Sequence, residues 1–108
     1  MTAVTITRKD GHITAVECDG HTDYGEEGED IVCAALSSVV QTAVLGLMQI
    51  VGINVKLERD EKRGYLNMIL PDLDEASRHD ADIILGTMLC GISDLHEGFS
   101  KYIKLECL

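Results

Sequence analysis

Short segments in which apolar and polar residues alternate occur five times along the chain, and this period of two predicts β-strands. The first two predicted strands, 2–8 and 13–18, are joined by Asp10 and Gly11, a dipeptide that favours the tight turn of a β-hairpin. The remaining alternating segments are 53–59, 65–70 and 102–107. In 53–59 we expect Ile53, Val55 and Leu57 to share one face, and in 65–70 we expect Leu66, Met68 and Leu70 to point inward.

Two longer segments carry apolar residues at helical spacing. The first, 31–51, has an apolar side formed by Val32, Ala35, Leu36, Val39, Val40, Ala43, Leu47 and Ile50, and Gly52 is suited to end it. The second is predicted to begin near Asp72 and Glu75, which have the spacing of a capping box, and to end at about Glu97. Its core-facing residues are predicted to be Ala81, Ile84, Met88, Ile92 and Leu95.

The predicted order is therefore ββαββαβ. A chain of 108 residues fits one domain, so we assign 1–108 to a single domain. One sheet with both helices packed on one of its faces is the economical way to bury these apolar sides. The predicted fold class is α+β, a two-layer sandwich.

Acidic residues outnumber basic ones, and they are unevenly placed. The chain has 9 Lys and Arg against 19 Asp and Glu, a net charge of −10. Seven of the acids lie between Glu17 and Asp30, whereas 31–55 carries no charge. Because affinity for nucleic acid comes from Lys and Arg on phosphates, we expect no direct nucleic-acid partner.

The uncharged segment 31–51 is long enough to raise the question of a membrane span, but its polar residues form one stripe along the helix. The chain also begins without the apolar core of a signal peptide, so we expect a cytoplasmic protein with no membrane partner. Solvated helix faces usually carry charges, so this stripe indicates a contact with a second copy, a homodimer. The stripe consists of Ser37, Ser38, Gln41, Thr42 and Gln49.

Cys33 lies where the acidic Gly-containing segment meets the first predicted helix. If Asp30 caps that helix, Cys33 is its third residue, among free N–H groups that favour an anion. A thiol placed there ionises readily and becomes a nucleophile, and the same N–H groups would stabilise an oxyanion. The alternative is that Cys33 is a small core residue like Ala34 and Ala35. Cysteines 18, 90 and 107 lie inside predicted elements, where we expect them to fill the core.

His21 follows Gly20 at the end of the second predicted strand, and its imidazole suits a general base near neutral pH. The pair formed with Cys33 brackets the acidic loop; the alternative is a solvated loop histidine. Zinc held by His21, Cys33 and Asp23 lacks a further ligand at suitable spacing, so we expect no metal and no cofactor. Ser37, one helical turn after Cys33, is a candidate hydrogen-bond donor to it.

The segment GHTDYGEEGEDIVCAALSS resembles the signature of the ribosomal-processing cysteine protease family, often called Prp. Its pattern is Gly-His, a short acidic loop with glycine, and then Asp-Ile-Val-Cys-Ala-Ala and a serine. Position 22, often alanine in the family, is threonine here. The matching positions are Gly20, His21, Gly28, Asp30, Ile31, Val32, Cys33, Ala34, Ala35 and Ser37.

The resemblance implies a small cytoplasmic dimer with a Cys-His dyad, in which Cys33 is the nucleophile and His21 the base. It also implies removal of a short N-terminal extension from a large-subunit ribosomal protein, with cleavage after an aromatic residue, in support of ribosome assembly. Gly20, Gly28, Asp30, Ala34 and Ser37 are then supporting residues. The alternative is a dimeric ribosome-assembly adaptor, a binding module in which Cys33 is inert.

Overall fold

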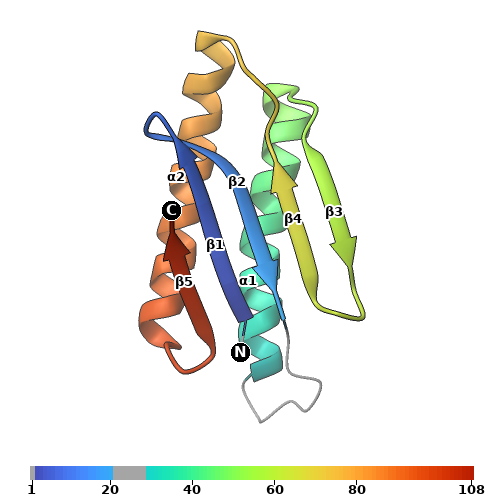
Figure 1. The fold of residues 1–108 in the computed structure, drawn as a ribbon, viewed down its shortest axis with the longest axis vertical. Helices are drawn as coiled ribbons and strands as arrows, with labels where there is room; N and C mark the ends of the chain where they lie inside the picture. Colours follow the sequence, from blue (N-terminus) through green and yellow to red (C-terminus); the bar gives the residue numbers. More distant parts are fainter. Residues whose placement is uncertain (1, 21–28) are drawn as a thin grey trace.

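A computed structural model describes residues 2–20 and 29–108, with the side chains of residues 29 and 30 left undescribed. Within these ranges the order of elements is ββαββαβ, as predicted (Figure 1). The elements are β1 (Thr2–Lys9), β2 (His12–Asp19), α1 (Glu29–Leu45), the π-helical turn η1 (Gly46–Val51), β3 (Lys56–Asp60), β4 (Tyr65–Ile69), α2 (Glu75–Gly98) and β5 (Ile103–Cys107).

The five strands form one sheet in the order β3-β4-β2-β1-β5, and both helices cover the same face of it (Figure 1). Neighbouring strands are antiparallel, except that β1 and β5 run parallel. The predicted hairpin turn is confirmed, because Asp10 and Gly11 both have positive φ, 54° and 82°, as a type I′ turn requires. The α+β two-layer sandwich is therefore confirmed.

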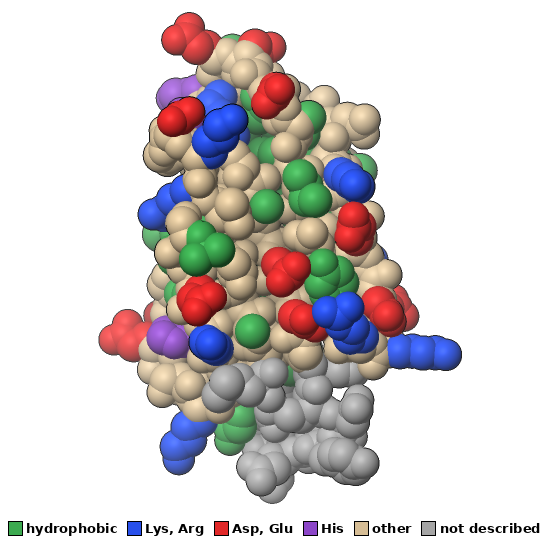
Figure 2. Space-filling model, in the orientation of Figure 1, with side chains coloured by type: hydrophobic (Ala, Val, Ile, Leu, Met, Phe, Trp, Pro, Cys, Tyr) green, Lys and Arg blue, Asp and Glu red, His purple; other side chains and the backbone are tan. Residues whose placement is uncertain are grey.

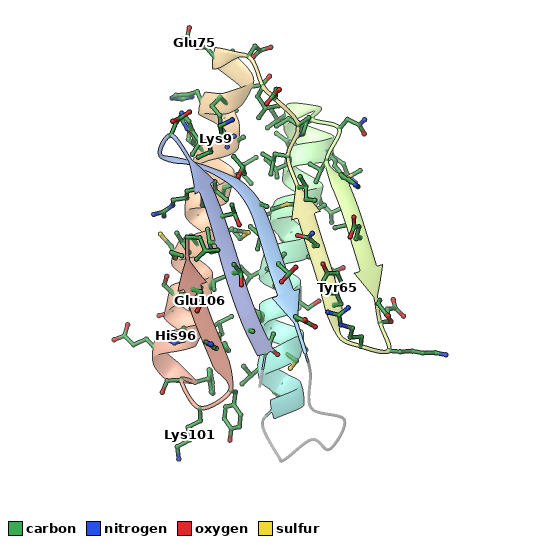
Figure 3. The ribbon with its side chains drawn as sticks, viewed as in Figure 1. Lys9, Tyr65, Glu75, His96, Lys101 and Glu106 are labelled. Carbon is green, nitrogen blue, oxygen red and sulfur yellow. The ribbon has the colours of Figure 1, made fainter. Side chains whose placement is uncertain are left out.

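The core lies between the sheet and the two helices. Val4 and Ile6 of β1, Val16 of β2 and Met68 of β4 are 0–1% exposed and all point toward the helices. The opposite face of the sheet is solvent-exposed, and acidic and basic side chains are interspersed on it (Figure 2). Glu106 and Tyr65 mark that face (Figure 3). The helices contribute Val32, Leu36, Val40, Ala43, Val44, Leu47, Ala81, Leu85, Met88 and Ile92 to the core.

The end of the first helix departs from the prediction at one residue. Ile50 was expected on the apolar side but is 82% exposed. The reason is the change to π-helical geometry in η1, where the wider turn rotates Ile50 away from the core. Val51 packs against the core in place of Ile50. Gly52 ends the helix in the left-handed conformation, φ 82°, as predicted.

The third strand begins at Lys56, later than predicted. Ile53 donates its N–H to Leu47 O at 2.9 Å, so the residues after Gly52 complete the helix end before the chain joins the sheet. Ile53 and Val55 are buried as expected, but Leu57 is 38% exposed because β3 is an edge strand whose side chains are all exposed.

The cap of α2 is Asp74 and not Asp72. The Asp74 carboxylate accepts the Ser77 N–H at 2.7 Å, and this backbone hydrogen bond lowers the pKa of Asp74. The helix then continues to Gly98. Leu85 is fully buried whereas Ile84, which was predicted to face the core, is only partly buried.

One helical segment in the described part of the chain, Ile31–Val51, is long and apolar enough to cross a bilayer by length and composition. A third of the window is buried, and the buried residues face the sheet and α2.

Candidate active site

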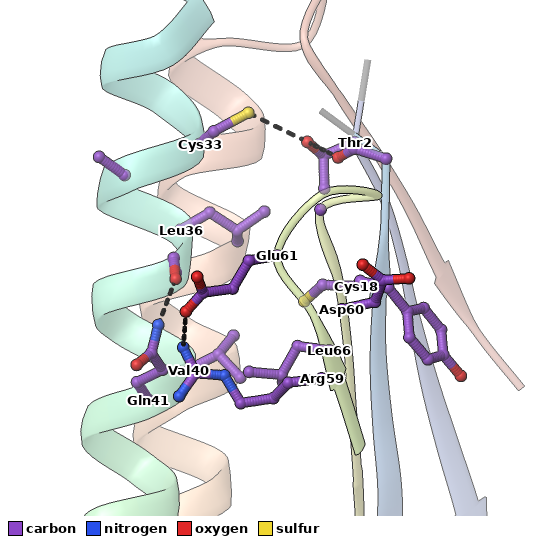
Figure 4. Close-up of a pocket in the computed structure, with 15 residues that line it drawn as sticks. Thr2, Cys18, Cys33, Leu36, Val40, Gln41, Arg59, Asp60, Glu61 and Leu66 are labelled. Carbon is purple, nitrogen blue, oxygen red and sulfur yellow. Dashed lines mark hydrogen bonds and ion pairs between the residues drawn. The ribbon is translucent and has the colours of Figure 1, made fainter. Parts of the chain in front are cut away.

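A cavity of about 350 Å³ opens between the first half of α1 and the ends of β2, β4 and the β3–β4 turn (Figure 4). Cys33, Leu36 and Val40 form the helical wall, and Cys18 and Leu66 face them from the sheet. The remaining lining residues are Thr2, Gly20, Ala34, Ser37, Gln41, Arg59, Asp60, Glu61, Gly64 and Tyr65. The cavity thus has an apolar interior and a polar mouth.

Cys33 is partly exposed and borders this cavity. It lies further into the helix than predicted, because α1 begins at Glu29, so that Asp30 is the second helical residue and not the cap. Cys33 is then the fifth residue. Only the first four N–H groups of a helix lack a helical partner, so the free N–H groups belong to residues that precede Cys33. The expectation that Cys33 is the third helical residue is wrong.

Thr2 holds the Cys33 side chain from the sheet. Its hydroxyl oxygen lies 3.3 Å from Cys33 Sγ, and the same hydroxyl donates to the carbonyl oxygen of Gly20 at 2.7 Å. Thr2 is only 5% exposed and shares the inward face of β1 with Val4 and Ile6. It therefore places a polar group where the strand pattern otherwise places apolar side chains.

Gly20 is fixed from two sides at the end of β2. Its N–H donates to Gly64 O at 3.1 Å, and its carbonyl accepts the Thr2 hydroxyl. The φ angle of 94° is one that side-chain-bearing residues rarely adopt. The backbone is therefore defined up to the residue directly before His21. His21 and Gly28 lie outside the described residues, as does Asp23 of the zinc alternative, so a contact between His21 and Cys33 stays a prediction.

Of the other predicted supporting residues, the structure describes the side chains of Ala34 and Ser37. Ala34 and Ser37 line the cavity together with Cys33. Ser37 was considered as a donor to Cys33, but its hydroxyl instead accepts a hydrogen bond from the Gln41 side-chain amide. The side chain of Asp30 lies outside the described part of the structure.

Cys18 is the second thiol of the cavity and differs from Cys33 in its environment. It is 8% exposed, as predicted for a core residue, and burial together with the charge of Glu17 raises the pKa of Cys18 to about 12. At neutral pH its sulfur is therefore protonated and a poor nucleophile. Cys90 and Cys107, also expected in the core, are exposed.

Charged residues of the β3–β4 turn form the mouth of the cavity. Arg59 and Glu61 pair at 3.5 Å and extend toward α1 (Figure 4). Arg63 binds both carboxylate oxygens of Asp19, at 3.1 and 2.8 Å, and lies 4.4 Å from the centre of the Tyr65 ring. The turn is thereby fastened to the end of β2, next to Gly20.

The residues that form this site lie in a segment that matches a known protein family. Residues 1–104 match the family model described as cysteine protease Prp. The chain belongs to the Prp family of cysteine proteases. Both walls of the cavity lie within the matched residues, so the resemblance seen in the sequence is confirmed.

Individual Prp proteins resemble the whole chain. A ribosomal processing cysteine protease Prp of Staphylococcus aureus is 33% identical over 107 residues, 98% of each chain. A crystal structure of the essential protease Prp from S. aureus in complex with a substrate peptide has a TM-score of 0.88 at 30% identity and covers 100% of both chains. A second S. aureus structure, with a covalently linked product peptide, has a TM-score of 0.86 at 32% identity, again with full coverage of both chains.

The sequence alone did not indicate the sheet side of the site. Thr2, Gly64, Arg59 and Glu61 lie more than ten residues from the Prp signature, and none belongs to a recognisable motif. The hairpin turn at Asp10 and Gly11 was the one available signal, because it brings the start of β1 beside the end of β2.

Proposed function

We propose that this Prp-family protein is an endopeptidase in which the Cys33 thiolate is the nucleophile and His21 the general base. The single observation that supports this most is the position of Cys33: a partly exposed thiol at the border of an apolar cavity, 3.3 Å from the Thr2 hydroxyl. That hydroxyl also binds the carbonyl of the residue before His21. An inert core cysteine would need neither exposure nor a polar partner.

In the proposed reaction His21 takes the proton of Cys33, and the sulfur attacks the scissile carbonyl carbon. The C–N bond then breaks, the leaving amine takes the proton back from His21, and a thioester remains on Cys33. Water, deprotonated by His21, hydrolyses the thioester and regenerates the thiol. A Cys-His dyad suffices for these steps.

The proposed substrate is a large-subunit ribosomal protein that carries a short N-terminal extension, cut after an aromatic residue in support of ribosome assembly. The cavity supports an apolar residue at the cleavage site, because Leu36, Val40 and Leu66 line its interior beside Cys33. Its volume falls within the range of about 300–1,000 Å³ typical of ligand sites. The S. aureus structures with substrate and covalently linked product peptides support a peptide substrate.

The decisive experiment is incubation of the purified protein with the precursor of that ribosomal protein, followed by mass spectrometry. We expect one truncation after an aromatic residue, and no truncation by Cys33→Ala. Cys107→Ala is the matched control, since it removes an exposed thiol that does not line the cavity and should leave cleavage intact. Cleavage by Cys33→Ala at the unsubstituted rate would refute the nucleophile. Tight binding of the precursor without any truncation would favour the adaptor alternative.

We further propose that the protein is a homodimer that associates through the outer face of its helices. A groove of about 580 Å³ runs between α1 and α2, and small residues let the helices approach, since a Cβ at Gly91 would come within 3.2 Å of Val39. Ile50 and Ile83 border the groove and are 82% and 58% exposed. None of the residues that line the groove is charged, and protruding isoleucines beside a hollow suit a two-fold contact.

The free cysteines and the net charge bear on where the protein acts and on what it binds. All four cysteines are free thiols, which accords with a reducing compartment, and we propose a cytoplasmic location. The net charge of −10 supports a protein substrate without direct nucleic-acid contact.

A further inference from the structure

The geometry points to Thr2 as a positioning residue for Cys33, whose hydroxyl changes its hydrogen-bond role when the thiol loses its proton. The inference builds on Cys33 as the nucleophile of the proposed function. It concerns a residue from the opposite side of the fold, in the first strand, outside the Prp signature.

The resting state is determined by counting protons. A threonine hydroxyl has one proton to donate. The carbonyl oxygen of Gly20 can only accept, so at 2.7 Å the hydroxyl proton of Thr2 is committed to it. Toward Cys33 Sγ, at 3.3 Å, the Thr2 oxygen is then the acceptor, and the thiol S–H is the donor. This arrangement fixes the direction of the S–H bond.

The ionised state requires a different arrangement. When the thiol proton leaves for the base, the electron pair stays on sulfur, and the Thr2 oxygen would face it with a lone pair. Rotation about the Thr2 Cβ–Oγ1 bond turns the hydroxyl proton from Gly20 O to Sγ, and no covalent bond of Thr2 forms or breaks. The thiolate gains a donor, and hydrogen bonds to charged groups are stronger than those between neutral groups.

Burial increases the effect of this single group. Thr2 is 5% exposed, so its hydroxyl is shielded from water that would compete for its proton. Its backbone is held as well, because its N–H donates to Tyr102 O at 2.9 Å in the pairing with β5. Among the described residues, the Thr2 hydroxyl is the hydrogen-bonding partner of Cys33 Sγ.

When the hydroxyl turns to sulfur, the carbonyl of Gly20 loses its donor. Gly20 directly precedes His21 in the chain, so ionisation of Cys33 and the backbone beside the proposed base are coupled through one hydroxyl group. Gly20 keeps its second anchor, the hydrogen bond from its N–H to Gly64 O.

The test compares Thr2→Val, which removes the hydroxyl at nearly constant shape, with Thr2→Ser, which keeps it. The measured quantity is the rate of Cys33 alkylation by iodoacetamide as a function of pH, followed by mass spectrometry of the Cys33 peptide. For Thr2→Val we expect the midpoint of the alkylation rate against pH to rise by about one pH unit, which is a tenfold loss of thiolate at any pH below the midpoint. For Thr2→Ser we expect a rise no more than half as large, because the hydroxyl is kept.

Thr14→Val is the matched control. The Thr14 hydroxyl also donates to a strand carbonyl, Thr7 O at 3.3 Å, in the same hairpin but away from Cys33. We expect its midpoint to equal that of the unsubstituted protein. An unchanged midpoint in Thr2→Val, or an equal rise in Thr14→Val, would overturn the inference.

The S–H stretching band of Cys33 reports the hydrogen bond to Thr2 in the unsubstituted protein. If Thr2→Val does not fold, the infrared S–H stretching band of Cys33, isolated by difference against Cys33→Ala, replaces it. A hydrogen-bonded frequency supports the role of Thr2, and a free-thiol frequency contradicts it.

In peptide cleavage, Thr2→Val should lower kcat and leave KM unchanged. A protein that cleaves no peptide but shows the midpoint shift would disprove the proposed function and leave this inference standing.

Discussion

Cys18 and Cys33 border one cavity from opposite walls, and burial separates their chemistry. Cys18 is buried, and this burial raises the pKa of its thiol to about 12 from the ordinary value of 9.0, whereas Cys33 is partly exposed and hydrogen-bonded to Thr2. A folded-state pKa above the unfolded value stabilises the fold at every pH below about 9, and the stability is lost as the pH rises toward 12.

The buried thiol therefore predicts a loss of stability in alkali. Between pH 8 and 10.5 we expect ionisation of Cys18 to lower the free energy of unfolding by about 2 kcal/mol, because the unfolded chain releases this proton first. Urea unfolding at the two pH values measures the change. Cys18→Ala should lose correspondingly less stability over the same interval. Equal losses in both proteins would show that Cys18 is accessible to solvent.

Gly20 is predicted to tolerate no side chain. Because its φ is 94°, Gly20→Ala should destabilise the fold by about 1–2 kcal/mol and slow alkylation of Cys33, since the strand end moves with Thr2. Gly86→Ala is the control. A Cβ at Gly86 meets no atom within 4 Å, and this position in α2 should gain about 0.5–1 kcal/mol. Urea unfolding of both variants checks the prediction, which fails if Gly20→Ala is as stable as Gly86→Ala.

The groove between the helices predicts how two copies of the chain would associate in the proposed dimer. Ile83→Glu places a charge on its exposed rim, and we expect it to turn a dimer into a monomer in sedimentation equilibrium at micromolar concentration. Leu57→Glu, an equivalent change at a 38% exposed residue of the edge strand β3, should leave the dimer intact. A dimer that survives Ile83→Glu but dissociates in Leu57→Glu would move the interface to the sheet edge.

The acidic segment before Cys33 predicts a salt-dependent capture of substrate. Replacing Glu26, Glu27 and Glu29 by glutamine should slow cleavage of a basic ribosomal substrate and flatten the dependence of kcat/KM on ionic strength. Alkylation of Cys33 by a neutral reagent should change little, which provides the internal control. An unaltered salt dependence would reduce these charges to a role in solubility.

The sequence allowed most of the fold to be predicted, because alternation and helical spacing report which side of an element is apolar. Leu66 and Met68 are buried in β4 as their alternation required. Ile50 was misplaced because no residue type marks the onset of a π-helical turn. Asp74 was missed as the cap of α2 because Asp72 has an acidic residue, Glu75, three positions later, whereas Asp74 has Ser77 there.

The site was only half predictable for a related reason. Cys33 belongs to a motif, whereas Thr2 reaches it through the register of β1 on β2. An uninterrupted hairpin closed at Asp10 and Gly11 would place Thr2 opposite Asp19. The register shifts between Thr7 and Arg8, so that Ala3 pairs with Asp19 and Thr2 comes beside Gly20. A one-residue bulge of this kind leaves no clear trace in the sequence.

The parallel pairing of β1 with β5 has a consequence for the timing of activity during synthesis. Thr2 precedes Cys33 in the chain, but its N–H donates to Tyr102 O, and β1 acquires its second neighbour only when 103–107 has been added. A nascent chain that already contains Cys33 and His21 still lacks the strand that holds Thr2 against the thiol. The pairing that holds Thr2 beside Cys33 is therefore completed only after 103–107 has been synthesised, long after Cys33 itself.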